Sequence, residues 1–195
     1  SDASFVRSWV GASVGRHGRI DVLYNNVGVS RPGLIGDLSD DDWKDGFDLK
    51  FLGAMRCSRE AWPHLRGSGG SVVNIAGIGG RTGSGDFTIG GSVNAALLNL
   101  TKALADRGVH DGVRVNAINP GSVLTDRLQS RVHALAAEQR LDPEAAALKM
   151  AQGLRVPRFG EPAEIARAVA FLASPQAGYC NGAILDIDGG QTRTL

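Results

Sequence analysis

Apolar residues along the chain recur at two spacings, and these spacings predict strands that alternate with helices. Short apolar runs at 20–24, 72–75, 113–118 and 184–187 are typical of buried strands. Between them, apolar residues recur at helical spacing over 5–12, 43–55, 93–104 and 165–172. Strands that alternate with helices indicate a parallel sheet with helices on both faces. We therefore expect an α/β fold built on a doubly wound, Rossmann-like parallel sheet.

Residues near the expected helix ends sharpen this prediction. Asp2 can cap the first helix. The second helix, opened by acidic residues at 40–42, is expected to end near Pro63. The third is expected to run from about Gly91 to Arg107. No internal repeat or linker interrupts the pattern, so residues 1–195 are expected to form a single domain.

Composition narrows the class of protein. The formal net charge is +1, which gives no electrostatic reason to expect nucleic acid or a membrane surface as a partner. No apolar run approaches the roughly 18 residues of a membrane span, and no signal peptide opens the sequence. Cys57 and Cys180 are isolated, so neither a metal site nor a disulfide framework is expected. These features favour a cytoplasmic, enzyme-like protein.

Four ordered motifs resemble those of the short-chain dehydrogenase/reductase family. They are IDVLYNNVG at 20–28, INPGSVLT at 118–125, RFGEPAEIARAVAFLAS at 158–174 and ILDIDGG at 184–190. The resemblance implies an oxidoreductase that transfers a hydride between NAD or NADP and a small alcohol or ketone. It also implies assembly as a homodimer or homotetramer. Apolar residues on more than one stripe of the two central helices agree with self-association; they include Phe51, Met55, Leu98 and Leu100.

The same resemblance assigns residues to the cofactor. Asn25, Asn26 and Gly28 would line its adenosine side, after the first strand. The nicotinamide side would be lined by Pro120, Gly121, Val123 and Thr125. The NNVG segment is equally typical of a strand-ending turn that needs Asn and Gly. The two interpretations are compatible.

The family's catalytic side chains are absent from their motif positions. Counting back from Lys102 places the family's serine, tyrosine and lysine at Gly77, Gly90 and Asn94. A register shifted by one gives Ile89 and Val93, which does not restore the motif. Glycine has no side chain, and an amide carries no charge to stabilise a phenolate. We therefore expect ordinary turnover of secondary alcohols to be absent or very slow.

Lys50 suggests how the chemistry could be rearranged. It occupies the position of the family's helix asparagine, while Asn94 occupies that of the family's lysine. If the two have exchanged roles, Lys50 restores the positive charge and Asn94 contacts the ribose. This hypothesis predicts that both side chains face one cleft. The alternative is that Lys50 fills space or reaches solvent on an interface helix.

Two segments set further expectations. The family's glycine-rich TGxxxGxG loop and its N-terminal βαβαβ portion, about 60 residues, are absent from this chain, so its first strand should be an exposed edge. The glycine cluster at 77–85 is interpreted as a flexible active-site loop. Residues 122–156 are interpreted as a substrate lid or, alternatively, as ordinary helical packing. The expected pocket-wall residues of the lid are Leu124, Leu128, His133, Met150 and Leu154.

Two functions remain open at this point. The retained NNVG and INPGSVLT motifs favour an NAD(P)-dependent oxidoreductase with an atypical proton donor. The missing serine, tyrosine and lysine favour a non-catalytic relative that binds a cofactor or partner subunits.

Overall fold

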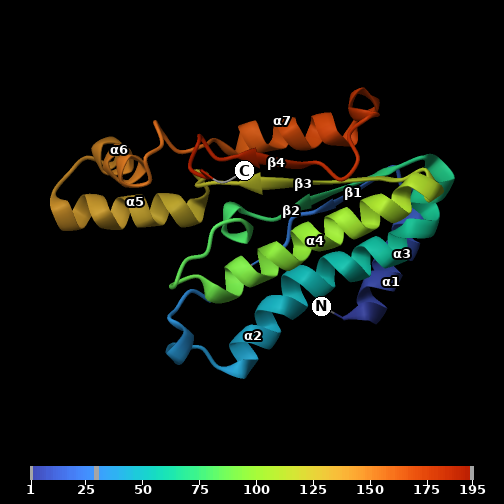
Figure 1. Cartoon of the computed structure of the whole chain (residues 1–195), viewed down its shortest axis with the longest axis horizontal. Coiled ribbons are helices and arrows are strands. Elements are labelled where there is room, and N and C mark those ends of the chain that lie inside the picture. Colours follow the sequence, from blue (N-terminus) through green and yellow to red (C-terminus); the bar gives the residue numbers. More distant parts are fainter. Residues whose placement is uncertain (1, 29–30, 194–195) are drawn as a thin grey trace.

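A four-stranded parallel sheet forms the centre of the molecule. The computed structural model describes residues 2–28 and 31–193. The strands are β1 (Val22–Asn25), β2 (Ser71–Ile75), β3 (Arg114–Pro120) and β4 (Ile184–Ile187), and they lie side by side in chain order. All three neighbouring pairs are parallel. The expected doubly wound α/β fold is confirmed (Figure 1).

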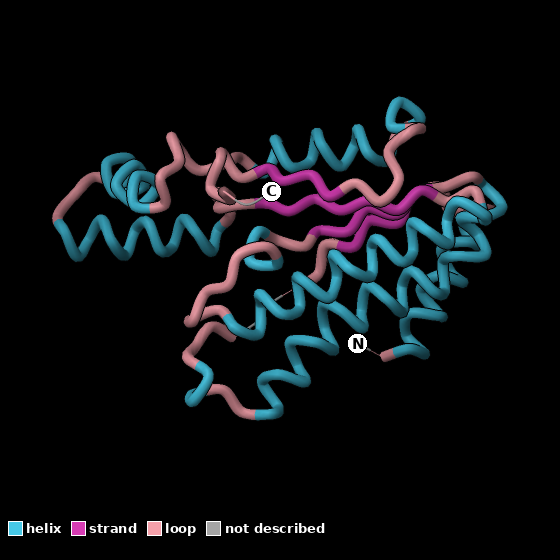
Figure 2. The backbone as a smooth tube through the Cα atoms, in the orientation of Figure 1, coloured by secondary structure: helices cyan, strands magenta, loops and turns pink. Residues whose placement is uncertain are grey.

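Helices cover both faces of this sheet, as Figure 2 shows. Helix α7 packs on one face, and α1, α3 and α4 lie on the other. Crossovers of this kind bury parallel strands on both faces, and Val72, Val73 and Ile118 are fully buried. The helices are α1 (Ala3–His17), α2 (Asp40–Gly46), α3 (Gly53–Ser68), α4 (Thr88–Asp111), α5 (Asp126–Gln139), α6 (Pro143–Gly153) and α7 (Pro162–Ala173).

Caps fix where the first helices begin. Asp2 caps α1, since its carboxylate accepts a hydrogen bond of 2.7 Å from the Ser4 amide. Ser39 and Asp42 form a capping box at α2. Three short turns complete the elements, namely η1 (Ile35–Asp37), η3 (Ile78–Gly80) and η4 (Pro175–Ala177).

Two predicted helix boundaries are wrong. The second helix does not end near Pro63, because α3 runs through this proline to Ser68. Ala61 and Leu65, on either side of it, are almost completely buried, and their packing keeps the helix intact. Helix α4 begins at Thr88 rather than near Gly91, so Gly90 and Gly91 are helical.

A π-helical segment, η2 (Phe47–Leu52), joins α2 to α3. The backbone remains helical throughout, so α2, η2 and α3 form one continuous rod. Such π segments occur frequently at functional sites. This one carries Lys50.

The first strand is the exposed edge that the sequence predicted. Among the described residues, β1 pairs only with β2. The side chains of Val22 and Tyr24 are each 43% exposed. Partial burial nevertheless raises the pKa of the Tyr24 phenol.

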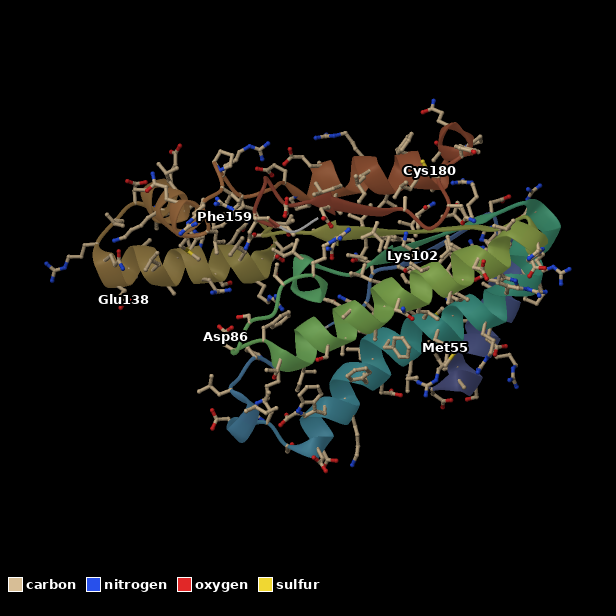
Figure 3. The ribbon with its side chains drawn as sticks, viewed as in Figure 1. Met55, Asp86, Lys102, Glu138, Phe159 and Cys180 are labelled. Carbon is tan, nitrogen blue, oxygen red and sulfur yellow. The ribbon has the colours of Figure 1, made fainter. Side chains whose placement is uncertain are left out.

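Helices α5 and α6 form an arm that projects beyond the sheet (Figure 1). The arm has an apolar cluster of its own, which includes Val132, Ala136, Ala146 and Phe159. Figure 3 shows Glu138 towards the far end of α5 and Phe159 near the sheet. The proposal of a lid at 122–156 corresponds to this arm, although its role as a lid stays a prediction.

The five residues expected to form the pocket wall of the lid lie in different environments. Leu128 lines a cavity. Leu124 and Met150 pack against the arm's own apolar cluster. His133 is exposed, and Leu154 is 39% exposed. Ordinary helical packing therefore accounts for Leu124 and Met150, and of these five residues only Leu128 lines a cavity.

Candidate active site

A cavity of about 340 Å³ opens at the carboxyl ends of β1, β2 and β3. This edge is where ligands bind in open α/β sheets. Two walls can be distinguished. The strand-end wall consists of Asn26, Gly28, Pro120 and Gly121, and the helix wall consists of Lys50, Phe87, Gly90 and Asn94. Gly77, at the end of β2, lies between them.

Lys50 and Asn94 meet in this cavity. The Lys50 ammonium donates hydrogen bonds to Asn94 Oδ1 at 2.6 Å and to the Ala76 carbonyl oxygen at 2.5 Å. Asn94 is 5% exposed, and its amide is therefore held firmly. The prediction that the two side chains face one cleft is confirmed.

Gly28 makes room for the lysine. A Cβ atom at Gly28 would lie 2.6 Å from Lys50 Cδ and 3.2 Å from Lys50 Cε. The aliphatic part of Lys50 thus runs directly over the Gly28 backbone. A larger residue at position 28 would push this side chain aside. The resemblance assigned Gly28 to the cofactor, and this second contact with Lys50 is visible only in the structure.

Burial changes the acidity of Lys50. Removal from water lowers the pKa of the ammonium from 10.5 to about 8, and the positive charge of Arg127 contributes in the same direction. Arg127 also lines the cavity, from the first turn of α5. None of the lining residues is an Asp or a Glu. The cavity is consequently electropositive, and its lysine can exchange a proton near neutral pH.

Asn94 occupies the space beside Gly77. A Cβ atom at Gly77 would lie 2.9 Å from Asn94 Nδ2. Gly77 also has a φ of +142°, which side chains rarely adopt. The glycine at this position and the asparagine on α4 therefore fit together.

Phe87 occupies the space beside Gly90 in the same way. A Cβ atom at Gly90 would lie 2.1 Å from Phe87 Cζ, and one at Gly79 would lie 3.2 Å from Phe87 Cε1. Two glycines thus accommodate one ring. The ring comes from the N-terminal end of α4, next to the loop that carries Asp86 in Figure 3. No local sequence pattern pairs Phe87 with Gly90, because their contact depends on how the loop folds back.

The cofactor residues expected from the resemblance fall into three groups. Asn26, Gly28, Pro120 and Gly121 line the main cavity. Val123 and Thr125 line a second cavity of about 400 Å³, which shares Asn26, Pro120, Gly121 and Arg127 with the first.

Asn25 belongs to neither cavity lining. Its amide donates hydrogen bonds to Asn74 Oδ1 at 2.8 Å and to Ser58 Oγ at 3.4 Å. Its side chain therefore ties β1 to β2 and α3. The interpretation of NNVG as a turn that needs Asn and Gly is wrong, because Asn25, Asn26 and Gly28 all lack a positive φ; the role of the Asn25 side chain is to join these elements.

Residues 2–28 and 31–193 contain neither a candidate metal site nor a candidate membrane span. Within these ranges, no three His, Cys, Asp or Glu residues gather as a metal site would require. No helix described there combines the length and apolar character needed to span a bilayer. Cys57 and Cys180 are free thiols.

Comparison with known proteins places the whole chain in one family. Residues 1–192 match the family profile described as enoyl-(acyl carrier protein) reductase. The chain is 35% identical over 175 residues to meso-2,3-butanediol dehydrogenase of Serratia marcescens, covering 90% of this chain and 65% of that protein. It is 35% identical over 191 residues to the short-chain reductase NovJ of Streptomyces niveus, covering 97% of this chain and 71% of that protein. The chain thus spans about two thirds of the length of these relatives.

Solved structures agree with this assignment. A short-chain oxidoreductase of Pseudomonas aeruginosa PAO1, described as containing an atypical catalytic center, superposes with a TM-score of 0.94 at 28% identity, covering 100% of this chain and 75% of that one. L-sorbose reductase of Gluconobacter frateurii, solved with NADPH and L-sorbose, gives a TM-score of 0.93 at 29% identity, covering 100% and 74%. From its parallel sheet, its strand-end motifs and these matches, we conclude that the chain belongs to the short-chain dehydrogenase/reductase family.

Proposed function

We propose that this chain forms most of an NAD(P)-dependent oxidoreductase that interconverts a small alcohol and its carbonyl compound, with Lys50 as the proton donor and acceptor. The main support for this proposal is the environment of the Lys50 ammonium. Hydrogen bonds to Asn94 and to the Ala76 carbonyl hold it in an electropositive cavity, with a pKa of about 8. A proton donor is most effective when its pKa lies near the working pH.

The strand-end wall fits a dinucleotide. It consists of small or amide residues without acidic groups, so it neither crowds nor repels the phosphates of a dinucleotide. Asn26, Gly28, Pro120 and Gly121 would hold the cofactor in the main cavity, with Asn94 towards its ribose. Val123 and Thr125 would hold it along the second cavity. The cofactor would supply or accept the hydride.

Lys50 would donate or accept the proton at the substrate oxygen. In carbonyl reduction, its ammonium gives a proton to the substrate oxygen while the carbonyl carbon receives the hydride, and the neutral amine regains a proton from water. In alcohol oxidation, the neutral amine takes the hydroxyl proton as the hydride leaves carbon. Asn94 and the Ala76 carbonyl keep the nitrogen in place in both directions.

This assignment predicts opposite pH dependences for the two directions. Reduction needs the ammonium, so its rate should fall as the pH rises through about 8. Oxidation needs the neutral amine, so its rate should rise over the same range. A tyrosine-based donor with an unshifted pKa near 10 would place both changes higher.

Removal of Lys50 tests the proposal directly. Lys50→Met should lower the turnover of the full-length protein by about 10²–10⁴-fold, the usual contribution of a general acid or base. The assay uses NADH and NADPH with a panel of small ketones and alcohols from pH 6 to 10. Lys44→Met is the matched control, because Lys44 is exposed and pairs only with Asp41 among the described residues. Equal turnover in both variants would refute the role of Lys50.

The second candidate function is a non-catalytic relative that binds cofactor or partner subunits. The glycines at 77 and 90 favour it. Under this alternative, NADPH binding is measurable by calorimetry while no ketone or alcohol of the panel is turned over at any pH.

The Phe87 ring interferes with substitutions that would restore the family motif. In a Gly77→Ser, Gly90→Tyr, Asn94→Lys triple variant, the new tyrosine would collide with the Phe87 ring. A fair test therefore adds Phe87→Ala. If this quadruple variant gains activity while the parent shows none, the non-catalytic alternative is supported.

A further inference from the structure

One peptide group connects Lys50 to the interior of the sheet. It joins Ala76 to Gly77, directly after β2. Its carbonyl oxygen accepts the hydrogen bond from Lys50 Nζ at 2.5 Å. Its N–H group donates to Asn119 Oδ1 at 2.9 Å. Both ends of the same peptide group are therefore engaged, one by the cavity lysine and the other by a buried amide.

This peptide group lies just beyond regular strand pairing. The Ala76 amide still donates to the Ile118 carbonyl at 2.9 Å, which continues the ladder between β2 and β3. At Gly77, the amide donates to a side chain of β3, that of Asn119, instead of to the backbone of this strand. The position of the Ala76 carbonyl oxygen thus depends on Asn119.

A chain of hydrogen bonds continues from Asn119. This residue is fully buried, and its Nδ2 donates to Asp186 Oδ1 at 2.9 Å. The same oxygen accepts a hydrogen bond of 3.0 Å from Arg81 Nε. Arg81 follows η3 directly, so Asn119 and Asp186 hold both ends of the turn that begins at Gly77.

We propose that Asn119, supported by Asp186, is a positioning residue that orients and polarises the Ala76–Gly77 peptide group towards the Lys50 ammonium. The physical basis is that hydrogen bonds in a chain strengthen one another. A peptide N–H that donates to a good acceptor makes its own carbonyl a better acceptor. The catalytic meaning of this arrangement rests on the proposed function, whereas its effect on the lysine does not.

The direction of the effect follows from charge. If the Ala76 carbonyl becomes a weaker acceptor, the ammonium loses stabilisation and the pKa of Lys50 falls further. The charged groups along this chain are Arg127 on α5, Arg81 after η3 and Asp186 on β4. A neutral substitution at position 119 leaves all three charges in place, so it isolates the hydrogen-bond contribution.

The test measures the acylation rate of individual lysines as a function of pH, by peptide mass spectrometry on the full-length protein. The midpoint of a lysine is the pH at which its acylation rate reaches half of its maximum. Lys44 and Lys149, both exposed, serve as internal references. In Asn119→Leu, the midpoint for Lys50 should fall by roughly half a pH unit, because one hydrogen bond to a charged group weakens by about 10–30% and loses its alignment.

Asn116→Leu is the matched control. Asn116 is another fully buried asparagine of β3, but its amide donates to the Cys180 carbonyl and accepts from the Ala183 amide, both at 2.9 Å and away from the cavity. Asn116→Leu should lower the free energy of unfolding by about as much as Asn119→Leu does, and it should leave the Lys50 midpoint unchanged. An unchanged midpoint in Asn119→Leu, or an equal shift in Asn116→Leu, would overturn the proposal.

The readout does not require turnover. If the Lys50 midpoint shifts as expected but no substrate is converted, the positioning role stands and the proposed reaction fails. If turnover depends on Lys50 but the Lys50 midpoint is the same in the wild type and in Asn119→Leu, the proposed reaction stands and the positioning role fails.

Discussion

The two walls of the cavity are built in different ways. The strand-end wall is formed by residues at the ends of parallel strands, and backbone geometry defines it: its glycines are close to neighbouring atoms, and no charged side chain contributes. The helix wall is formed by side chains that fill the space beside glycine residues. Lys50 lies over Gly28, Asn94 beside Gly77 and Phe87 beside Gly90. Backbone position defines the first wall, and side-chain packing against glycines defines the second.

The difference bears on the two candidate functions. A non-catalytic remnant would be expected to leave empty space or unpaired polar groups beside Gly77 and Gly90. Instead, each of these glycines is matched by a neighbouring side chain, and the Lys50 ammonium has two acceptors. This packing supports the proposed role of Lys50 over the non-catalytic alternative.

The largest expected effect concerns the charge on the helix wall. Because the pKa of Lys50 is lowered from 10.5 to about 8, the unfolded chain binds more protons than the folded chain between these values. The free energy of unfolding should therefore rise with pH across this window, by roughly 3 kcal/mol from this group. Below pH 8, the full cost of the buried charge is present.

Chemical denaturation of the wild type and of Lys50→Met from pH 7 to 10.5 measures this contribution. The stability difference between the two proteins should change by about that amount, since other titrating groups are common to both. A difference that stays constant with pH would show that the ammonium is not desolvated.

The strand-end wall should be intolerant of added volume. In Gly121→Ala, the new Cβ would lie 2.7 Å from Asp188 Cβ and 2.8 Å from its Cα, and backbone atoms cannot move aside easily. We expect a loss of about 1–3 kcal/mol in the free energy of unfolding. Gly153→Ala, with open space around the new methyl group, is the matched control. Equal stabilities would mean that the strand-end wall adapts as readily as the helix wall.

The pairing of Phe87 with Gly90 should appear as non-additivity. Gly90→Ala places a Cβ atom 2.1 Å from the ring, although alanine also favours the helix by about 1 kcal/mol. A net loss of roughly 1 kcal/mol is expected. In the Phe87→Ala background, the same substitution should become neutral or stabilising. Thermal melts of the four proteins in this double-mutant cycle give the coupling energy, and additive effects would contradict the proposed fit.

The smallest stability effect is expected at Gly28, where the clash is with a flexible side chain. Gly28→Ala should cost less than about 1 kcal/mol, because Lys50 can bend away. The displaced ammonium should nevertheless change its acylation midpoint. Gly36→Ala, which meets no atom within 4 Å, is the control. A normal midpoint in Gly28→Ala would show that the two walls are independent of each other.

Helix boundaries illustrate where local patterns stop being informative. Pro63 and the pair Gly90–Gly91 are unfavourable inside helices, so the sequence predicted ends at these points. In the structure, both lie within helices. Burial of Ala61 and Leu65 around the proline, and packing of Phe87 on Gly90, compensate for the local cost.

The candidate site was predictable to the extent that motif positions map onto strand ends. Asn26, Gly28, Pro120 and Gly121, which the resemblance assigned to the cofactor, line the cavity at the carboxyl ends of parallel strands, and their contact with a cofactor stays a prediction. The side chain of Asn25, one position earlier, points into the sheet interior and bonds to Asn74. A one-residue step along a strand reverses the side-chain direction, which a motif alone does not reveal.

Hydrophobic spacing and residues close in the chain were enough to predict the order of strands and helices and the sheet edge where the cavity lies. The contacts that join Lys50 to Asn94 and Gly77 to Asn119, across 44 and 42 residues, depend on how the elements pack in three dimensions. The same packing buries Lys50 beside these groups and lowers its pKa. Distance, burial and the local electric field arise when separate elements pack together, and no local pattern encodes them.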